Sequence, residues 1–465
     1  MNVNFFIKNK FIIITILVLF LIIIFCFGRG LSVGLILLII LSGITFFSLH
    51  KLGFKDRKIY LLFLIVIAIH LSTTLFMYYA DFQPFSGHQG DYIGYQKSAV
   101  EFSQSFRHGN FSVKDIALQY PDLYTGHYYP FIIGILYALT MPEEIIGLIF
   151  NVWLVALTII FVYLIILEIN GISKNAFIIG LITAIYPSYI FNSGLLLKDA
   201  IEVCFVILGL LFLIKIIKKF AWYNFLILYL ALICATHFRF YNGYALIFTF
   251  ILSWFLFANI NLKRKIIYGI IFIIILGFIP QIAANQGYYG INSFKMYLNL
   301  ERVNFYRQTV YNPARYNAPV SSTTTTATSA PTIGLGSSFV AESTPLGYLK
   351  SFVYVLLGPL PWQIKNLLQS FVLIETIPWY FLLFFIVDGI IILFKKRVKE
   401  AAPLLIFGII ATVVIAVFES NFGIIVRIRI PIFISLLCFA SLGFNENNIL
   451  YNYLKQPFVY FLNEG

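Results

Sequence analysis

Long apolar runs, separated by short polar stretches, form the dominant pattern of this sequence. A helix that crosses a membrane needs about 20 mostly apolar residues. The pattern therefore predicts an all-α, polytopic integral membrane protein with about 12 transmembrane helices, and with short amphipathic helices in its outer loops. The predicted spans are residues 10–28, 31–49, 59–79, 145–167, 175–193, 199–217, 222–237, 243–260, 265–283, 372–394, 402–418 and 430–445.

Lysine and arginine cluster in alternate loops between these runs. Clusters precede the first predicted helix and follow the second, fourth, sixth, eighth and tenth. Cytoplasmic loops of membrane proteins carry an excess of Lys and Arg, so we place these loops and both termini in the cytoplasm. The same alternation puts five stretches on the outer side. These are residues 80–128, 194–199, 237–242, 284–347 and 419–429.

The organisation that follows is one membrane domain with two extra helices in front of it. Residues 1–58 hold the two extra helices, and residues 59–283 form a membrane module with its first outer loop at 80–128. Residues 284–347 form a long outer loop whose Ser- and Thr-rich tract is low in complexity and predicts a tether. Residues 348–465 begin with an amphipathic segment at headgroup depth and continue into the last helices.

Composition narrows the class further. Of 465 residues, 60% are hydrophobic and only 11% are charged, and the mean hydropathy is +0.91. A soluble globule needs about a quarter of its residues charged, so a soluble multidomain protein is excluded. The net charge of +13 is explained by the basic loops, which makes nucleic acid a poor partner. The four cysteines show no metal or disulfide spacing, and the sequence predicts no metal site, although it leaves the use of a divalent ion open.

Four cations lie at helix ends on the predicted outer side, where cations are disfavoured. They are Lys198, Arg239, Arg427 and Arg429. Asp91, Asp199 and Glu419 can compensate part of this charge. A phosphate group at headgroup depth would compensate the rest, because arginine binds phosphate oxygens in a bidentate way. We therefore predict that the four cations bind the phosphate of a lipid.

A carboxylate beside such cations can take a proton from an alcohol while the cations hold a leaving phosphate. Asp91 is in a position to do this, although a lone Asp in an outer loop can equally cap a helix. Asp199 can instead pair with Lys198 or cap the following helix. The set suggests group transfer from a lipid-borne phosphate to a hydroxyl. No HExxH, GK[ST] loop or GxSxG is present, so the motifs of zinc proteases, Walker-type ATPases and serine hydrolases are missing.

Three motifs carry a resemblance to a known family. The first is GDYIGYQKSA at residues 90–99, where an Asp follows an early membrane helix. In the second, residues 129–131 (Tyr-Pro-Phe) lead to Asn151, and in the third, residues 186–188 (Tyr-Pro-Ser) lead to Lys198 and Asp199. Over roughly residues 59–260 the chain resembles the polyprenyl-phosphate-dependent membrane glycosyltransferases of the GT-C superfamily, near the protein O-mannosyltransferase and aminoarabinose transferase type.

The resemblance implies an inverting transfer. The alternation of charged loops places it on the outer face, and we expect the membrane to be the plasma (inner) membrane. Asp91 would be the catalytic base and Asp199 the second acidic position, and the donor would be a sugar on a polyprenyl phosphate. Tyr95, His127 and His237 would shape the sugar or acceptor pocket. The expected partners are membrane lipid, the lipid-linked sugar, and a glycan, lipid or protein acceptor. The family often has two adjacent acids at the first position, where Tyr92 follows Asp91 here, and the acceptor stays open.

Two other functions fit parts of the pattern. An O-antigen or exopolysaccharide polymerase also has a long outer loop, here 284–347, and outer arginines, here Arg427 and Arg429, and it uses polyprenyl-diphosphate glycans. A flippase or transporter of lipid-linked sugars would need charged groups at the middle of the bilayer. His70 and Asp388 are the main residues of that kind.

Overall fold

The computed structural model describes residues 28–82, 90–119, 128–278, 344–363, 373–396, 399–419 and 422–444, together with positions 299, 301, 303 and 304. Within these ranges the regular structure is entirely helical. The helices are α3 Arg29–Lys51, α4 Arg57–Tyr79, α5 Asp91–Arg107, α6 Val113–Gln119, α7 Tyr128–Leu139, α8 Glu144–Asn170, α9 Ser173–Ala184, α10 Pro187–Ser193, α11 Asp199–Lys218, α12 Trp222–Phe238, α13 Phe240–Phe257, α14 Leu262–Phe278, α17 Pro345–Leu357, α19 Leu373–Lys396, α20 Ala402–Phe418, α21 Phe422–Ile428 and α22 Ile430–Gly443. Short 3-10 turns occupy Pro361–Gln363 and Lys399–Ala401.

Seven of these helices are long and apolar enough to cross a membrane, and the bent pair α9 and α10 brings the number to eight if it counts as one span. The predicted count of twelve is not confirmed. The first predicted span, 10–28, lies outside the described residues. The spans predicted at 222–237 and 430–445 form α12 and α22, which have 17 and 14 residues. Both are short because the chain breaks beside an arginine, after α12 at Arg239 and before α22 at Arg429.

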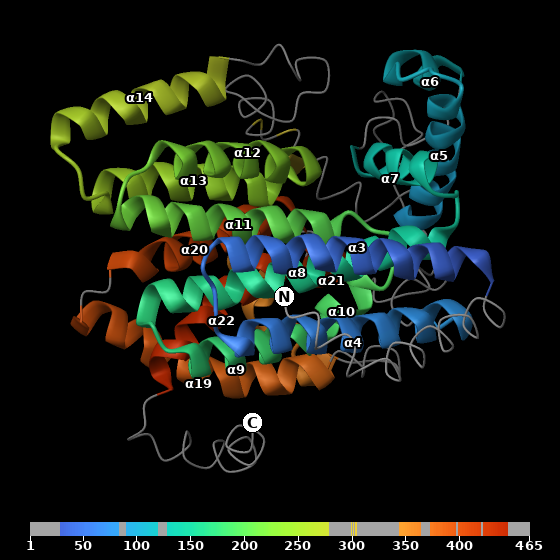
Figure 1. Ribbon diagram of the computed structural model, residues 1–465. Helices are drawn as coiled ribbons and strands as arrows, with labels where there is room; N and C mark the ends of the chain where they lie inside the picture. The colour runs from blue at the N-terminus through green and yellow to red at the C-terminus, as the bar shows by residue number, and fades with distance from the viewer. Residues whose placement is uncertain are drawn as a thin grey trace, which may run out of the picture.

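Two long apolar helices, α8 and α11, form the centre of the bundle. Helix α8 packs against α3, α4, α9 and α11, and α11 packs in turn against α12 and α13. Helices α20 and α22 complete the bundle, with α19 along the outer side of α22. In Figure 1 these helices lie roughly side by side, whereas α5 runs across their direction at the right-hand end, with α7 packed against it. Helix α3, as well as α20 and α22, thus packs onto the same bundle as α4, α8 and α11.

The bend between α9 and α10 replaces the straight span predicted at 175–193. The two helix axes differ by 60°, because Pro187 begins α10 and cannot continue the hydrogen bonding of α9. The bend leaves the carbonyl of Ala184 without a helical partner, and Nε2 of His70 on α4 donates to it at 2.9 Å. Nδ1 of His70 contacts the Ser193 hydroxyl at 3.0 Å. His70 therefore stabilises the bend.

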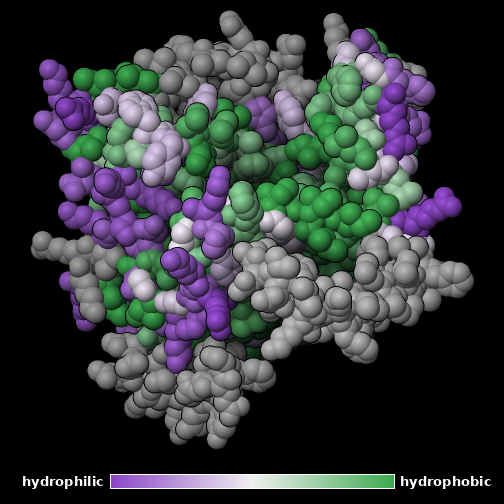
Figure 2. All heavy atoms as spheres, in the orientation of Figure 1, coloured by the Kyte–Doolittle hydropathy of each residue, from purple (hydrophilic) through white to green (hydrophobic). Residues whose placement is uncertain are grey.

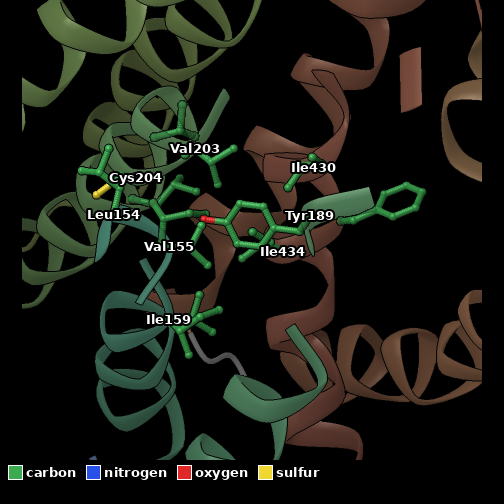
Figure 3. Close-up of a cluster of buried hydrophobic side chains, with 14 of the residues drawn as sticks. Leu154, Val155, Ile159, Tyr189, Val203, Cys204, Ile430 and Ile434 are labelled. Atoms are coloured by element: carbon green, nitrogen blue, oxygen red, sulfur yellow. The ribbon is translucent and has the colours of Figure 1, made fainter. Parts of the chain in front are cut away.

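The bend also aims α10 into the core. Figure 3 shows Tyr189 of α10 reaching between α8, α11 and α22, with its ring among aliphatic side chains of all three helices. Tyr189 is buried. The labelled neighbours are Leu154, Val155, Ile159, Val203, Cys204, Ile430 and Ile434. This packing fixes the segment that follows α10 and leads to Lys198.

The two ends of the bundle differ in chemistry. At one end the Asp56 carboxylate at the start of α4 accepts hydrogen bonds from Tyr163 of α8 and Ser173 of α9, and Lys218 of α11 pairs with Glu168 of α8 at 2.9 Å. The basic residues that follow α3, α8 and α11 therefore gather at a common end. Figure 2 shows hydrophobic residues to the right of the centre of the visible face, and hydrophilic residues over its left part and along the outer edge at the upper right.

Candidate functional site

The end of the bundle opposite the basic turns carries the polar residues predicted to act in chemistry. Asp91 is the first residue of α5, and Asp199 is the first residue of α11. Neither helix has a side-chain hydrogen bond at its N-cap. An acid in the first turn complements the positive end of the helix dipole, so both carboxylates lie where a helix start favours negative charge.

Arg239 is placed by a tight corner. Its backbone is extended, with φ −156 and ψ 104, and this single residue separates α12 from α13. The corner can close because residue 243 is glycine, since a Cβ there would lie 2.3 Å from the Cα of Thr236. Arg239 is only 8% exposed, yet its Nε has no hydrogen-bond partner among the described residues.

Arg427 of α21 joins the two acids. Its Nε donates to Oδ2 of Asp199 at 2.8 Å, and its Nη2 lies 3.4 Å from Oδ2 of Asp91. Nη2 of Arg239 donates to the other oxygen of Asp199 at 2.7 Å. The Asp199 side chain is 2% exposed, whereas the Asp91 side chain is 45% exposed. Asp199 is thus a buried acid held by two guanidinium groups, and Asp91 is an accessible acid held by one long contact.

Lys198 lies directly before this group, as the N-cap of α11, and is half-buried. Burial lowers the pKa of Lys198 to about 7, with the nearby guanidinium groups of Arg239 and Arg427 acting in the same direction. Asp199 and Asp91 act in the opposite direction. Three cations and two carboxylates therefore share this site, which we call the Asp91–Asp199 site.

Residues of the three motifs meet behind this site. The Tyr129 hydroxyl donates to the side-chain oxygen of Asn151 at 3.0 Å. The amide nitrogen of Asn151 donates in turn to the carbonyls of Leu195 and Leu197, at 3.0 and 3.3 Å. The ring of Tyr95 packs edge-on against that of Tyr129, with centroids 5.6 Å apart. This chain of contacts ties α5, α7 and α8 to the segment that carries Lys198.

The predicted pocket residues have different surroundings. Tyr95 lies on α5, one turn after Asp91, and is buried. His237 lies in the last turn of α12, where its Nδ1 contacts the carbonyl of Ile233 at 2.9 Å and its ring packs against Tyr128 with centroids 4.7 Å apart. His127 lies outside the described residues.

Arg429, although predicted to bind phosphate beside Arg427, has other partners. Its Nη2 donates to Oε1 of Glu375 at 2.8 Å, and its Nη1 donates to the carbonyl of Gly358 at 2.5 Å. The side chains of Arg429 and Glu375 are both buried, with exposed fractions of 1% and 2%. Glu375 also accepts from the Tyr186 hydroxyl at 2.5 Å and from the Ser188 backbone N–H at 2.9 Å. The structure thus places Arg429 in a closed polar cluster that joins α10, α17, α19 and α22.

Sequence reasoning missed two acids. Glu202 lies one turn after Asp199, is fully buried, and accepts from the Asn242 side chain at 2.8 Å. The same amide nitrogen of Asn242 donates to the carbonyl of Ile428 at 3.1 Å, beside Arg427. Glu375, the partner of Arg429, is the other missed acid. Both lie inside apolar runs, where an ionisable residue is expensive and usually functional, so that signal was present in the sequence.

No group of three or more His, Cys, Asp or Glu side chains that could hold a metal ion occurs in the described part of the chain. Comparison with known proteins adds no identity. Neither a protein-family model nor a curated protein matches the chain. The resemblance to GT-C enzymes therefore depends on the three sequence motifs alone.

Proposed function

We propose that the protein is a membrane glycosyltransferase that moves a sugar from a polyprenyl-phosphate donor to a hydroxyl acceptor, with inversion at the anomeric carbon. The observation that carries this proposal is the pair of unequal acids joined by Arg427, with a 2% exposed Asp199 and a 45% exposed Asp91. One acid is fixed as a charge that orients two arginines, and the other can reach an incoming hydroxyl. Unequal environments of this kind separate the roles of two carboxylates.

In the proposed reaction the acceptor hydroxyl gives its proton to Asp91 while its oxygen attacks the sugar C1. The bond between C1 and the phosphate oxygen breaks, and its electron pair leaves with the polyprenyl phosphate. Arg239, Arg427 and Lys198 stabilise the charge that develops on this leaving group. The Nε of the buried Arg239 has no hydrogen-bond partner in the described part of the chain, and a phosphate oxygen would supply one. Because Asp91 is open to solvent, it can release its proton before the next turnover.

The test uses the full-length protein in liposomes with polyprenyl-phosphate mannose, glucose, galactose and arabinose as donors and a cell-envelope extract as the source of the acceptor hydroxyl, and it measures release of free polyprenyl phosphate. Removing a general base typically costs about 10² to about 10⁴ in rate, so Asp91→Asn should lose activity by that factor while it keeps its expression and thermal unfolding. Asp115→Asn is the matched control, because Asp115 lies exposed on α6, close to α5 in the chain. Full activity in Asp91→Asn would rule out Asp91 as the base.

The two other functions gain no specific support. The polymerase interpretation relied on the paired arginines, of which Arg429 binds Glu375, and on the 284–347 loop, which lies almost wholly outside the described residues. The transporter interpretation relied on His70, which holds the α9–α10 bend, and on Asp388. Turnover of a polyprenyl-diphosphate glycan into longer chains, without turnover of any monophosphate donor, would replace the proposal with the polymerase.

A further inference from the structure

Asn242 connects three elements of the Asp91–Asp199 site through a single side-chain group. It lies in the first turn of α13, soon after the corner at Arg239, and it is buried. Its amide nitrogen donates to Oε1 of Glu202 at 2.8 Å and to the carbonyl of Ile428 at 3.1 Å. An amide nitrogen carries two hydrogens, so one side chain can serve both acceptors. Asn242 therefore joins α13 to α11 and to α21.

The three elements that meet at Asn242 are the ones that carry the ion pairs of Asp199. Each element gives one residue to the ion-paired group and a residue one to three positions further on to the Asn242 contact. The pairs are Asp199 and Glu202 on α11, Arg239 and Asn242 at the start of α13, and Arg427 and Ile428 at the end of α21. Residues three apart lie on the same side of a helix. The Asn242 contact therefore fixes the backbones right beside the ion-paired group.

The chemistry around position 242 requires a neutral hydrogen-bond donor. Helix α21 ends at Ile428, and Pro431 in the first turn of α22 has no N–H that could bind the Ile428 carbonyl. Glu202 on the other side is an acceptor as well. The amide nitrogen of Asn242 thus lies between two acceptors, and a carboxylate oxygen in its place would be repelled by both.

Close packing of α13 on α11 holds Asn242 against Glu202. The two helices approach further along at Gly209, where a Cβ would lie 2.7 Å from Cδ2 of Leu246. Helices α11 and α13 therefore form a firm base, and the Ile428 carbonyl is the point at which α21 is hydrogen-bonded to that base.

Stability alone would not favour this polar contact. Oε2 of Glu202 and Oδ1 of Asn242 are buried without a hydrogen-bond partner among the described residues. Apolar side chains of similar size would avoid the cost of such atoms. A buried polar group can instead fix one arrangement of the elements packed around it. What the Asn242 contact fixes is the position of α21, and with it the position of Arg427.

We propose that Asn242, held by Glu202, is a positioning residue that sets the separation between the guanidinium groups of Arg427 and Arg239. The inference rests on the proposed function, in which both guanidinium groups hold the phosphate of the lipid-linked donor. Without the hydrogen bond to Ile428, α21 can shift relative to α13, and the two groups no longer meet one phosphate. Asn242 is fully buried and acts only through the backbone of α21.

The first test measures the Kd of the full-length protein in nanodiscs for free polyprenyl phosphate, the leaving group of the proposed reaction. Asn242→Leu removes the donor at similar volume and should weaken binding by about 10- to 100-fold, the range found for residues that orient metal ligands. Asn175→Leu is the matched control, because Asn175 is a buried asparagine of α9 whose amide donates to the carbonyl of Ser441 at 2.9 Å, at the end of the bundle near Asp56. A Kd in Asn242→Leu no higher than in Asn175→Leu would overturn the proposal.

A double variant separates the position of α21 from the stability of the fold. Glu202→Leu combined with Asn242→Leu removes both polar side chains, so thermal unfolding should return close to that of the wild type. The Kd should stay raised, because the Ile428 carbonyl is still not held. If Asn242→Leu alone does not fold, the double variant decides. Recovery of both thermal unfolding and Kd would show that Asn242 only stabilises the fold, which overturns the proposal.

Amide hydrogen exchange tests the same contact without a ligand. Exchange in residues 422–428 should be faster in the double variant than in the wild type, whereas exchange in α9 should be unchanged. Unchanged exchange in residues 422–428 would overturn the proposal. A wild type that binds polyprenyl phosphate but transfers no sugar would contradict the proposed function and leave the role of Asn242 standing. A wild type that binds none would also contradict that function, and the exchange of α21 would then decide whether Asn242 holds this helix.

Discussion

Arg427 and Arg429 are two residues apart in the sequence, yet they belong to opposite kinds of environment. The Arg427 side chain is 19% exposed, and its longest ion pair, to the accessible Asp91, spans 3.4 Å. The Arg429 side chain is 1% exposed, its contacts include a 2.8 Å pair with the equally buried Glu375, and its guanidinium carbon lies 4.4 Å from the centre of the Phe433 ring. The first arginine can exchange partners with a ligand, whereas the second has no open side.

The difference shows that one short segment carries both a residue of the Asp91–Asp199 site, Arg427, and a residue that holds the surrounding helices together, Arg429. Arg429 is the N-cap of α22, and it binds the end of α17 at Gly358 and the start of α19 at Glu375. Trp379 and Tyr380 of α19 donate to the carbonyls of Leu356 and Leu357, which closes the same helix end. Because α21 leads directly into Arg429, this closed cluster fixes the helix on which Arg427 is carried.

The largest expected effect comes from opening the closed cluster. Arg429→Met removes the cation from the buried Glu375 carboxylate, and breaking a buried pair by removing one partner costs about 3–5 kcal/mol. We expect a large loss of yield and of thermal stability in detergent. The additional substitution Glu375→Gln removes the buried negative charge that has lost its partner, and the glutamine oxygen can still accept from the Ser188 N–H. The double variant should therefore regain more than half of the lost thermal stability.

The stability loss in Arg427→Met should be compared with that in Arg429→Met. Asp199 keeps its 2.7 Å pair with Arg239 when Arg427 is removed, so no buried carboxylate loses its last cation and we expect a clearly smaller loss than in Arg429→Met. Equal losses of stability in Arg427→Met and Arg429→Met would show that both arginines are structural, which would contradict the distinction between the two regions.

The helices could be foreseen more readily than their breaks. Apolar runs of about 20 residues mark α3, α4, α8, α11, α19 and α20, because burial of a membrane span leaves a continuous signal in the chain. The bend at Pro187 and the corner at Arg239 were hidden inside or beside such runs. Those breaks depend on tertiary partners, such as His70 for the free carbonyl of Ala184, that lie more than 100 positions away.

The site was predictable as a set of residues but not as a set of pairs. The sequence indicated that Asp91, Asp199, Arg239 and Arg427 carry unexplained charge at helix ends, and the structure brings these four together. It could not distinguish Arg427 from Arg429, because the distinction depends on Glu375, which is 54 positions away from Arg429. Charge at a helix end is visible in one chain segment, whereas the partner that neutralises it is a property of the packed bundle.

The next prediction concerns the planar guanidinium group of Arg427, which can donate to two oxygens at once. Arg427→Lys keeps the charge but cannot reach Asp199 and a second oxygen at once, because lysine lacks the planar fork. A lost hydrogen bond to a charged group costs about 1.5–3 kcal/mol, so KM for the donor that is turned over in the liposome assay should rise by about 10- to 100-fold. The matched control is Arg264→Lys, since Arg264 is exposed on α14 and should leave KM unchanged. A fall in kcat with KM unchanged would show that Arg427 acts mainly on the charge that develops on the leaving phosphate, whereas unchanged kcat and KM would contradict its place in the site.

The smallest expected effect is the pH dependence of donor binding through Lys198, whose pKa burial and the neighbouring guanidinium groups lower to about 7. A bound phosphodiester favours the charged amine and raises that pKa, so binding takes up a proton. Affinity is then fully present below about pH 7 and falls above it, by about tenfold between about pH 6 and about pH 8. The phosphodiester itself gains or loses no proton in this range, so the change reports on the protein. Lys198→Arg keeps its charge throughout and should give a flat profile, measured as KM against pH. If Lys198→Arg shows the same tenfold change as the wild type, another group titrates and Lys198 does not contact the phosphate. A flat profile in Lys198→Arg would show that the Asp91–Asp199 site responds to pH through a ligand-binding residue, which the closed Arg429 cluster cannot do because it has no exposed side.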